Sequence, residues 1–182
     1  MSELPPWEPP FHGDEHEAVF GALDRLRATF RWKCADLDRA GLAATTAASE
    51  LTLGGLLKHL ALIEDYYFQV KILGRQMPVD WADADWDNDN WEFSSARDAA
   101  PEALYALWDG AVERSRTAVS EIVDRGGLDA PADVTLPDGG AVNIRRMVLD
   151  LIEEYGRHAG HADIVREAID GRTGENPPWP PE

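Results

Sequence analysis

The stretch NIRRMVLDLIEEYGRHAGHADIVREAIDG, residues 143–171, decides the fold. Its apolar residues recur every three or four positions, which is the period of an amphipathic helix. Asn143 is a favourable N-cap and Gly171 a typical C-terminal stop, so the sequence predicts one long helix between them. The side chains that this helix would bury are Ile144, Met147, Val148, Leu151, Ile152, Tyr155, Ala159, Ala162 and Ile169.

Three more segments share the helical period, and we expect helices over residues 14–39, 52–74 and 101–125. Thr52 is a plausible N-cap, and Pro101 suits the first turn of a helix. Strand signals are confined to a short hairpin candidate at residues 133–142. The sequence therefore predicts an all-α protein, a four-helix bundle of the up-down-down-up type.

The bundle, residues 14–174, is flanked by proline-rich arms at residues 1–13 and 175–182. Proline fixes φ and removes a backbone donor, so both arms are expected to be extended, and Trp7 and Trp179 are expected to hold them on the body. Between the second and third helices, the connection from Arg75 to about Ala100 is long and rich in Asp and Trp. Its tryptophans favour a loop that folds against the bundle.

Composition excludes several classes of function. The chain has 34 acidic against 17 basic residues and a formal net charge of −17, which repels nucleic acid and anionic lipid. No apolar run approaches the ~20 residues that cross a bilayer, and the N-terminus does not look like a signal peptide. With a single cysteine and no internal disulfide, the sequence predicts a soluble protein of the cytoplasm that binds neither nucleic acid nor membrane.

Polar residues on the predicted inner faces are the candidate site. Asp150, Glu154, His158 and His161 fall within an arc of about 80° on the last helix, with Glu154 and His158 deepest. His59 is predicted at the centre of the buried face of residues 52–74. A carboxylate and an imidazole one turn apart, with a facing histidine, suit a divalent ion that keeps open positions. The alternatives are a solvated Glu–His pair and a hydrogen-bonded core histidine.

The segments EEYGRHAGHADIVREAIDG (153–171) and GGLLKHLALIEDYYF (54–68) resemble the DinB-like superfamily of metal-binding four-helix bundles. The resemblance extends over about residues 15–174 and is strongest to an uncharacterised branch near the mycothiol-dependent maleylpyruvate isomerases. It implies His59, Glu154 and His158 as metal ligands, with zinc or nickel as the ion. His161 stands where many relatives carry glutamine, which implies a supporting role. Asp150 stands where close relatives often have histidine, so either orienting a ligand or binding the ion stays open.

The function implied by this resemblance is a thiol-dependent transferase or isomerase. A metal-bound low-molecular-weight thiol such as mycothiol would attack a small electrophilic substrate. The thiol would come from outside the protein, because Cys34 has no histidine at helical spacing and is expected to be a buried small residue. Homodimerisation is also expected from the family.

Two alternatives remain at this point. The first is a metal-dependent hydrolase that uses bound water, and the second is a non-catalytic bundle that binds a ligand or partner. Arg27 and Arg166 are candidates for holding a carboxylate of a substrate or thiol cofactor, although ion-pair partners within the helices are the simpler interpretation.

Overall fold

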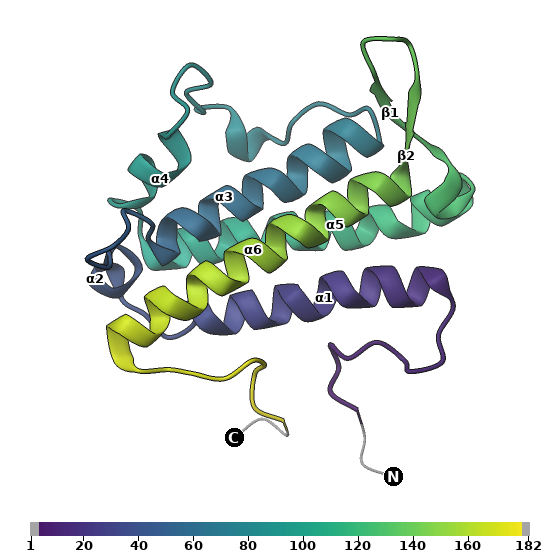
Figure 1. The fold of residues 1–182 in the computed structure, drawn as a ribbon. Coiled ribbons are helices and arrows are strands. Elements are labelled where there is room, and N and C mark those ends of the chain that lie inside the picture. Colours follow the sequence, from purple (N-terminus) through teal and green to yellow (C-terminus); the bar gives the residue numbers. More distant parts are fainter. Residues whose placement is uncertain (1–3, 180–182) are drawn as a thin grey trace.

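Four long helices form the protein, whose computed structural model describes residues 4–179 (Figure 1). They are α1 (Glu15–Cys34), α3 (Leu53–Asp65), α5 (Pro101–Asp124) and α6 (Ile144–Asp170). The shorter helices are α2 (Arg39–Leu42) and α4 (Trp91–Ala96), with a π-helical segment at Tyr66–Ile72 and 3₁₀ turns at Val79–Trp81 and Gly127–Asp129. The strands β1 (Pro131–Thr135) and β2 (Ala141–Asn143) form one antiparallel hairpin. The predicted all-α bundle is confirmed. No helix within residues 4–179 is long and apolar enough to cross a membrane.

Helices α1 and α6 run in the same direction. At their N-terminal ends Arg145 donates hydrogen bonds to the carboxylate of Glu15. At their C-terminal ends Arg166 donates to the backbone carbonyl of Lys33. Two helices that meet start to start and end to end lie parallel.

Helices α3 and α5 form a second parallel pair. Near their N-terminal ends Gly54 lies so close to Leu104 that an added Cβ would be 3.2 Å from its Cδ1 atom. At the other end Arg125 donates to the carbonyl of Ile72. Joining two parallel helices takes a long connection, which is the physical reason for the long segment between α3 and α5.

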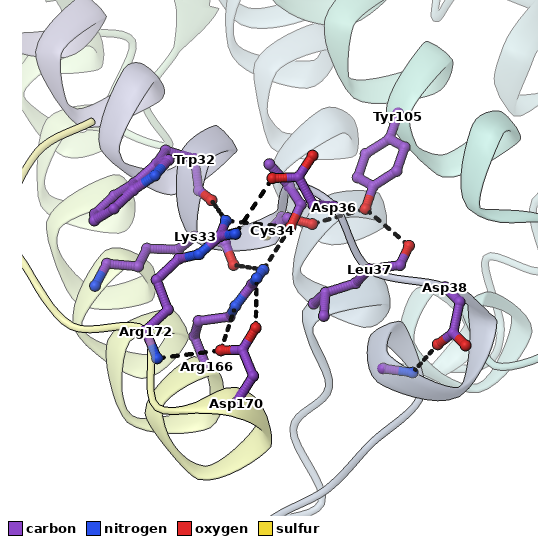
Figure 2. A network of polar contacts seen from close by, with 12 residues as sticks. Trp32, Lys33, Cys34, Asp36, Leu37, Asp38, Tyr105, Arg166, Asp170 and Arg172 are labelled. Atoms are coloured by element: carbon purple, nitrogen blue, oxygen red, sulfur yellow. Dashed lines mark hydrogen bonds and ion pairs between the residues drawn. The ribbon is translucent and has the colours of Figure 1, made fainter. Parts of the chain in front are cut away.

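Polar side chains close the C-terminal end of α1 (Figure 2). Tyr105, near the start of α5, donates to the carbonyl of Cys34 at 2.7 Å, so α1 and α5 are antiparallel. Arg166 is 1% exposed and donates to the carbonyl of Lys33 and to the carboxylate of Asp170. The last carbonyls of a helix have no partner within it, and these side chains supply the missing donors.

The first helix is shorter than predicted. It ends at Cys34 rather than Arg39, because Asp36 adopts a left-handed conformation with φ of 62°. Asp38 then accepts a hydrogen bond from the backbone N–H of Gly41 and begins the separate helix α2. A pattern of apolar residues does not register such a break, because the break depends on the backbone angle of one residue.

The second helix changes its winding. It is α-helical to Asp65 and π-helical over Tyr66–Ile72, and the chain turns at Gly74 with φ of 67°. The predicted ends are otherwise confirmed: Thr52 and Asn143 accept hydrogen bonds from backbone N–H groups of the first turns that they cap. Pro101 is the first residue of α5, and Gly171 ends α6 with φ of 79°.

The buried face of α3 differs from the predicted one. It consists of Leu53, Gly54, Gly55, Leu56, Leu57, Leu60, Ala61, Glu64 and Asp65. His59 is half-buried at the margin of this face, not at its centre, and Tyr66 is exposed. The prediction was wrong because it placed Tyr66 in the core and did not include the carboxylates of Glu64 and Asp65. Those carboxylates are buried because arginines of other helices pair with them.

The connection between α3 and α5 folds against the bundle in part. It contains a 3₁₀ turn (Val79–Trp81) and α4, two helical pieces that the sequence analysis did not predict. Trp81 is buried and donates through Nε1 to Asp65 at 2.8 Å. Trp86, by contrast, is 62% exposed.

The described parts of the two arms lie along α1. Glu8 pairs with Arg25, and a Cβ added to Gly21 would lie 2.5 Å from that of Pro9. Trp7 and Trp179 pack edge to face with ring centroids 5.7 Å apart, so the arms contact each other. Residues 1–3 and 180–182, which include two of the prolines in the second arm, lie outside the described residues.

Candidate metal centre

His59 on α3 faces Glu154 and His158 on α6. One potential ligand atom from each residue lies within 4.8 Å of the other two. Nε2 of His158 is 3.3 Å from Oε2 of Glu154, one helical turn away. The rings of His59 and His158 meet edge to face with centroids 4.9 Å apart. The structure therefore brings together the three residues that the sequence analysis singled out.

His158 is the most buried member of this cluster. Burial, together with the nearby His59, His161 and Arg157, lowers the pKa of His158 from 6.5 to about 4. The imidazole is consequently neutral at physiological pH, and one of its nitrogens carries a free lone pair. A neutral imidazole is the form that binds a metal ion.

The remaining two candidates on α6 differ in their surroundings. Nδ1 of His161 lies 3.3 Å from Nδ1 of His158, so one ring donates and the other accepts. This contact leaves Nε2 of His158 directed at Glu154. The carboxylate of Asp150 instead accepts a hydrogen bond from Nε of Arg146 at 2.6 Å.

Helix α4 contributes two residues that the sequence analysis missed. Oε1 of Glu92 is 3.1 Å from Nδ1 of His59. The ring of Phe93 stacks on the same imidazole, with centroids 5.4 Å apart and planes inclined by 25°. Nothing in the local pattern signals these contacts, because α4 lies in a segment that resembles a loop and reaches His59 only through the tertiary fold.

Tyr67, in the π-helical segment, lies close enough to Asp150 and Glu154 on α6 to interact with their charges. Burial and the carboxylates of Asp150 and Glu154 raise the pKa of its phenol, which therefore keeps its proton at neutral pH. Nζ of Lys71 lies 4.2 Å from the centroid of the Tyr67 ring. Such π-helical turns occur often at functional sites, and this one adds a hydrogen-bond donor to the surroundings of the cluster.

A second group of polar residues lies deeper in the bundle. Arg27 donates two hydrogen bonds of 2.7 Å to Glu64, and both side chains are buried. Burial lowers the pKa of Arg27, but the Glu64 carboxylate more than offsets it, so the net shift is upward. Burial and Glu64 also raise the pKa of Tyr155, whose hydroxyl accepts a hydrogen bond from Trp108. Arg27 and Arg166 are thus ion-pair partners, the simpler of the two interpretations.

The donor set of His59, Glu154 and His158 suits a divalent cation. Zinc binds imidazole nitrogen and carboxylate oxygen at about 2.0–2.2 Å, which places tetrahedral ligands about 3.4 Å apart. The 3.3 Å between Oε2 of Glu154 and Nε2 of His158 already matches that separation. The candidate ligand atoms of the three residues lie up to 4.8 Å apart, so the side chains would have to move slightly closer together to bind one zinc ion. Three protein ligands leave at least one position for water or a substrate, as in catalytic sites.

The chain matches a family model and resembles solved structures. A family model described as mycothiol-S-transferase matches residues 18–171. A crystal structure of a conserved protein from Enterococcus faecalis has a TM-score of 0.67 at 16% identity and covers 88% of this chain and 99% of that one. The mycothiol-dependent maleylpyruvate isomerase has a TM-score of 0.52 at 16% identity, covering 78% of this chain and 59% of that one. At such identities the structures show the fold alone. No curated protein gives a significant match.

Proposed function

Because this chain belongs to the mycothiol-S-transferase family, which is DinB-like, we propose that it joins a low-molecular-weight thiol of the mycothiol type to a small electrophile. The observation that carries the proposal is the convergence of His59 from α3 with Glu154 and His158 from α6. In this proposal the three residues hold one divalent ion, with zinc or nickel as the candidates.

A divalent ion held by these three residues would lower the pKa of a thiol bound to it, which would make the thiolate form available at neutral pH. The residues of the chain prepare the site for that role. His158 is neutral at physiological pH and directs Nε2 at the site. Glu154 brings a negative charge, which offsets part of the charge of the cation.

The reaction forms a C–S bond between the thiolate and an electrophilic carbon. In a transfer reaction the carbon loses its leaving group, and in an addition the substrate takes up the proton that the thiol released. Tyr67 keeps its phenolic proton and can donate a hydrogen bond from Oη to an electronegative atom of the substrate. An isomerase would follow the same addition with elimination of the thiol.

The thiol must be supplied from outside. Cys34 is fully buried, and burial raises the pKa of its thiol far above the ordinary value. A buried neutral thiol is a poor nucleophile. Its backbone carbonyl accepts the hydrogen bond from Tyr105, so the residue belongs to the packing between α1 and α5.

The decisive experiment combines purified protein, zinc or nickel, mycothiol and a panel of electrophiles: an alkyl halide, an epoxide and an unsaturated dicarboxylate. Mass spectrometry would follow the thioether, or for the dicarboxylate its thiol-dependent isomer. Glu154→Gln removes the charged ligand, and Glu153→Gln is its matched control because that neighbouring side chain is 70% exposed and pairs with Arg157. We expect acceleration by the wild type and by Glu153→Gln, and its loss in Glu154→Gln.

Two results would contradict the proposal. One is an equal rate in Glu154→Gln and wild type. The other is a metal-dependent product that contains oxygen from oxygen-18 water and forms without thiol, which would make the protein a hydrolase.

A further inference from the structure

We propose that Glu92 is a positioning residue that fixes the tautomer of His59. Its carboxylate accepts a hydrogen bond from Nδ1–H of His59, which leaves the lone pair of Nε2 for a cation. This inference rests on the proposed metal site and adds to it a residue from outside the two ligand-bearing helices.

The contact between the two side chains is well defined. Oε1 of Glu92 lies 3.1 Å from Nδ1 of His59, and the side chains are only 16% and 17% exposed. A neutral imidazole has one donor nitrogen and one acceptor nitrogen. An ionised carboxylate only accepts, so the proton belongs on Nδ1. Phe93 stacks on the ring and restricts its rotation.

Helix α4 is itself held in place. Nζ of Lys58 lies 3.8 Å from the centroid of the Trp91 ring and donates to Oγ of Ser95 at 2.8 Å. Ala96, the last residue of α4, is buried. These contacts lie on either side of Glu92 in the sequence, so the carboxylate is presented to His59 by a fixed backbone. The segment between α3 and α5 thus has a role at the site, which its acidic composition alone does not reveal.

A carboxylate that accepts from a ligating histidine orients the ring and makes the other nitrogen more basic. Loss of such a partner typically weakens metal binding 10- to 100-fold. We therefore expect Glu92→Ala to bind zinc about 10- to 100-fold more weakly than the wild type. Glu92→Gln keeps a neutral acceptor and should lie between them.

The first test uses metal-free protein. Nitrogen-15 NMR of the histidine rings at about pH 8, where imidazoles are neutral, reports which nitrogen carries the proton. The His59 signals are assigned by their loss in His59→Ala. We expect the Nδ1–H tautomer in the wild type and a shift toward Nε2–H in Glu92→Ala. An Nε2–H tautomer in the wild type, or no change in Glu92→Ala, would overturn the inference.

The second test is zinc affinity, measured by competition with a chelator. The control is Glu50→Ala, because the carboxylate of Glu50 is 91% exposed and pairs only with an arginine at the end of α4 in the described contacts. Equal affinity of Glu92→Ala and wild type would overturn the role of Glu92 and leave the metal site intact. Absence of zinc binding by the wild type would instead contradict the proposed function, while the NMR result still decides the tautomer.

Discussion

The imidazoles of His59 and His158 meet edge to face with their centroids 4.9 Å apart, although one belongs to α3 and the other to α6. Burial of His158 keeps its ring neutral, since its pKa falls to about 4. The neutral ring of His158, the facing ring of His59 and the carboxylate of Glu154 together form a set of metal-binding donors. This arrangement is the basis of the metal-dependent function that we propose.

Removing one partner of the buried ion pair between Arg27 and Glu64 should destabilise the bundle strongly. Glu64→Gln removes the buried carboxylate and leaves Arg27 paired with the more exposed Asp24 at 3.0 Å, so we expect a loss of up to about 3–5 kcal/mol in the free energy of unfolding. Urea denaturation measures this. Glu8→Gln, which breaks an exposed pair with Arg25, should cost less than about 1 kcal/mol. Similar losses in both variants would contradict this account of the ion pair.

Cys34 predicts a specific dependence of stability on alkaline pH. Burial raises the pKa of the folded thiol above its ordinary value of 9.0, so only the unfolded chain ionises as the pH passes that value. Stability from this group is complete below the unfolded pKa and is then lost at up to about 1.4 kcal/mol per pH unit. The wild type should therefore lose more stability than Cys34→Ala between about pH 9 and 10.

Cys34→Ala should also retain thiol-transfer activity, because the thiol that reacts comes from outside the protein. Comparison of the two proteins in the same denaturation and transfer assays checks both points. Parallel pH profiles would argue against a raised pKa. An inactive but folded Cys34→Ala would argue for a direct role of the cysteine.

Asp65 should control the mobility of the connection between α3 and α5. It accepts hydrogen bonds from Trp81 and Arg114 at 2.7–2.9 Å and is fully buried. Asp65→Asn leaves part of this network unsatisfied, at a cost of about 1–3 kcal/mol. We expect faster trypsin cleavage at the exposed Arg75 and Arg97, measured by mass spectrometry.

The control for that experiment is Asp83→Asn, since this aspartate lies exposed in the same connection. Its cleavage rate should equal that of the wild type. Asp65 does not anchor the connection if the cleavage rate of Asp65→Asn equals that of the wild type. The same holds if the faster cleavage is fully explained by the lower free energy of global unfolding of the variant.

The sequence predicted the long helices well because their ends carry local signals. Thr52, Asn143 and Gly171 act at the termini where they were expected. The early end of α1 was missed because it depends on the positive φ of Asp36. Helix α4 was missed because its short segment has no sustained period.

The cluster of His59, Glu154 and His158 could be predicted from the spacing of Glu154 and His158 on one helix face and from the family resemblance. The residues around the cluster could not be predicted in this way. The contact of Glu92 with His59 and the burial of Glu64 both depend on residues far away in the sequence, which a helical period cannot reveal. A helical pattern of apolar and polar residues predicts that carboxylates are exposed. Glu64 and Asp65 are buried instead, because each pairs with an arginine on another helix.

The most direct test of the central claim is the metal content of the untagged protein, measured by elemental mass spectrometry beside His59→Ala and His158→Ala. We expect close to one equivalent of divalent metal in the wild type and its loss in both variants. A wild type that holds no metal after incubation with zinc, nickel or manganese would contradict this claim.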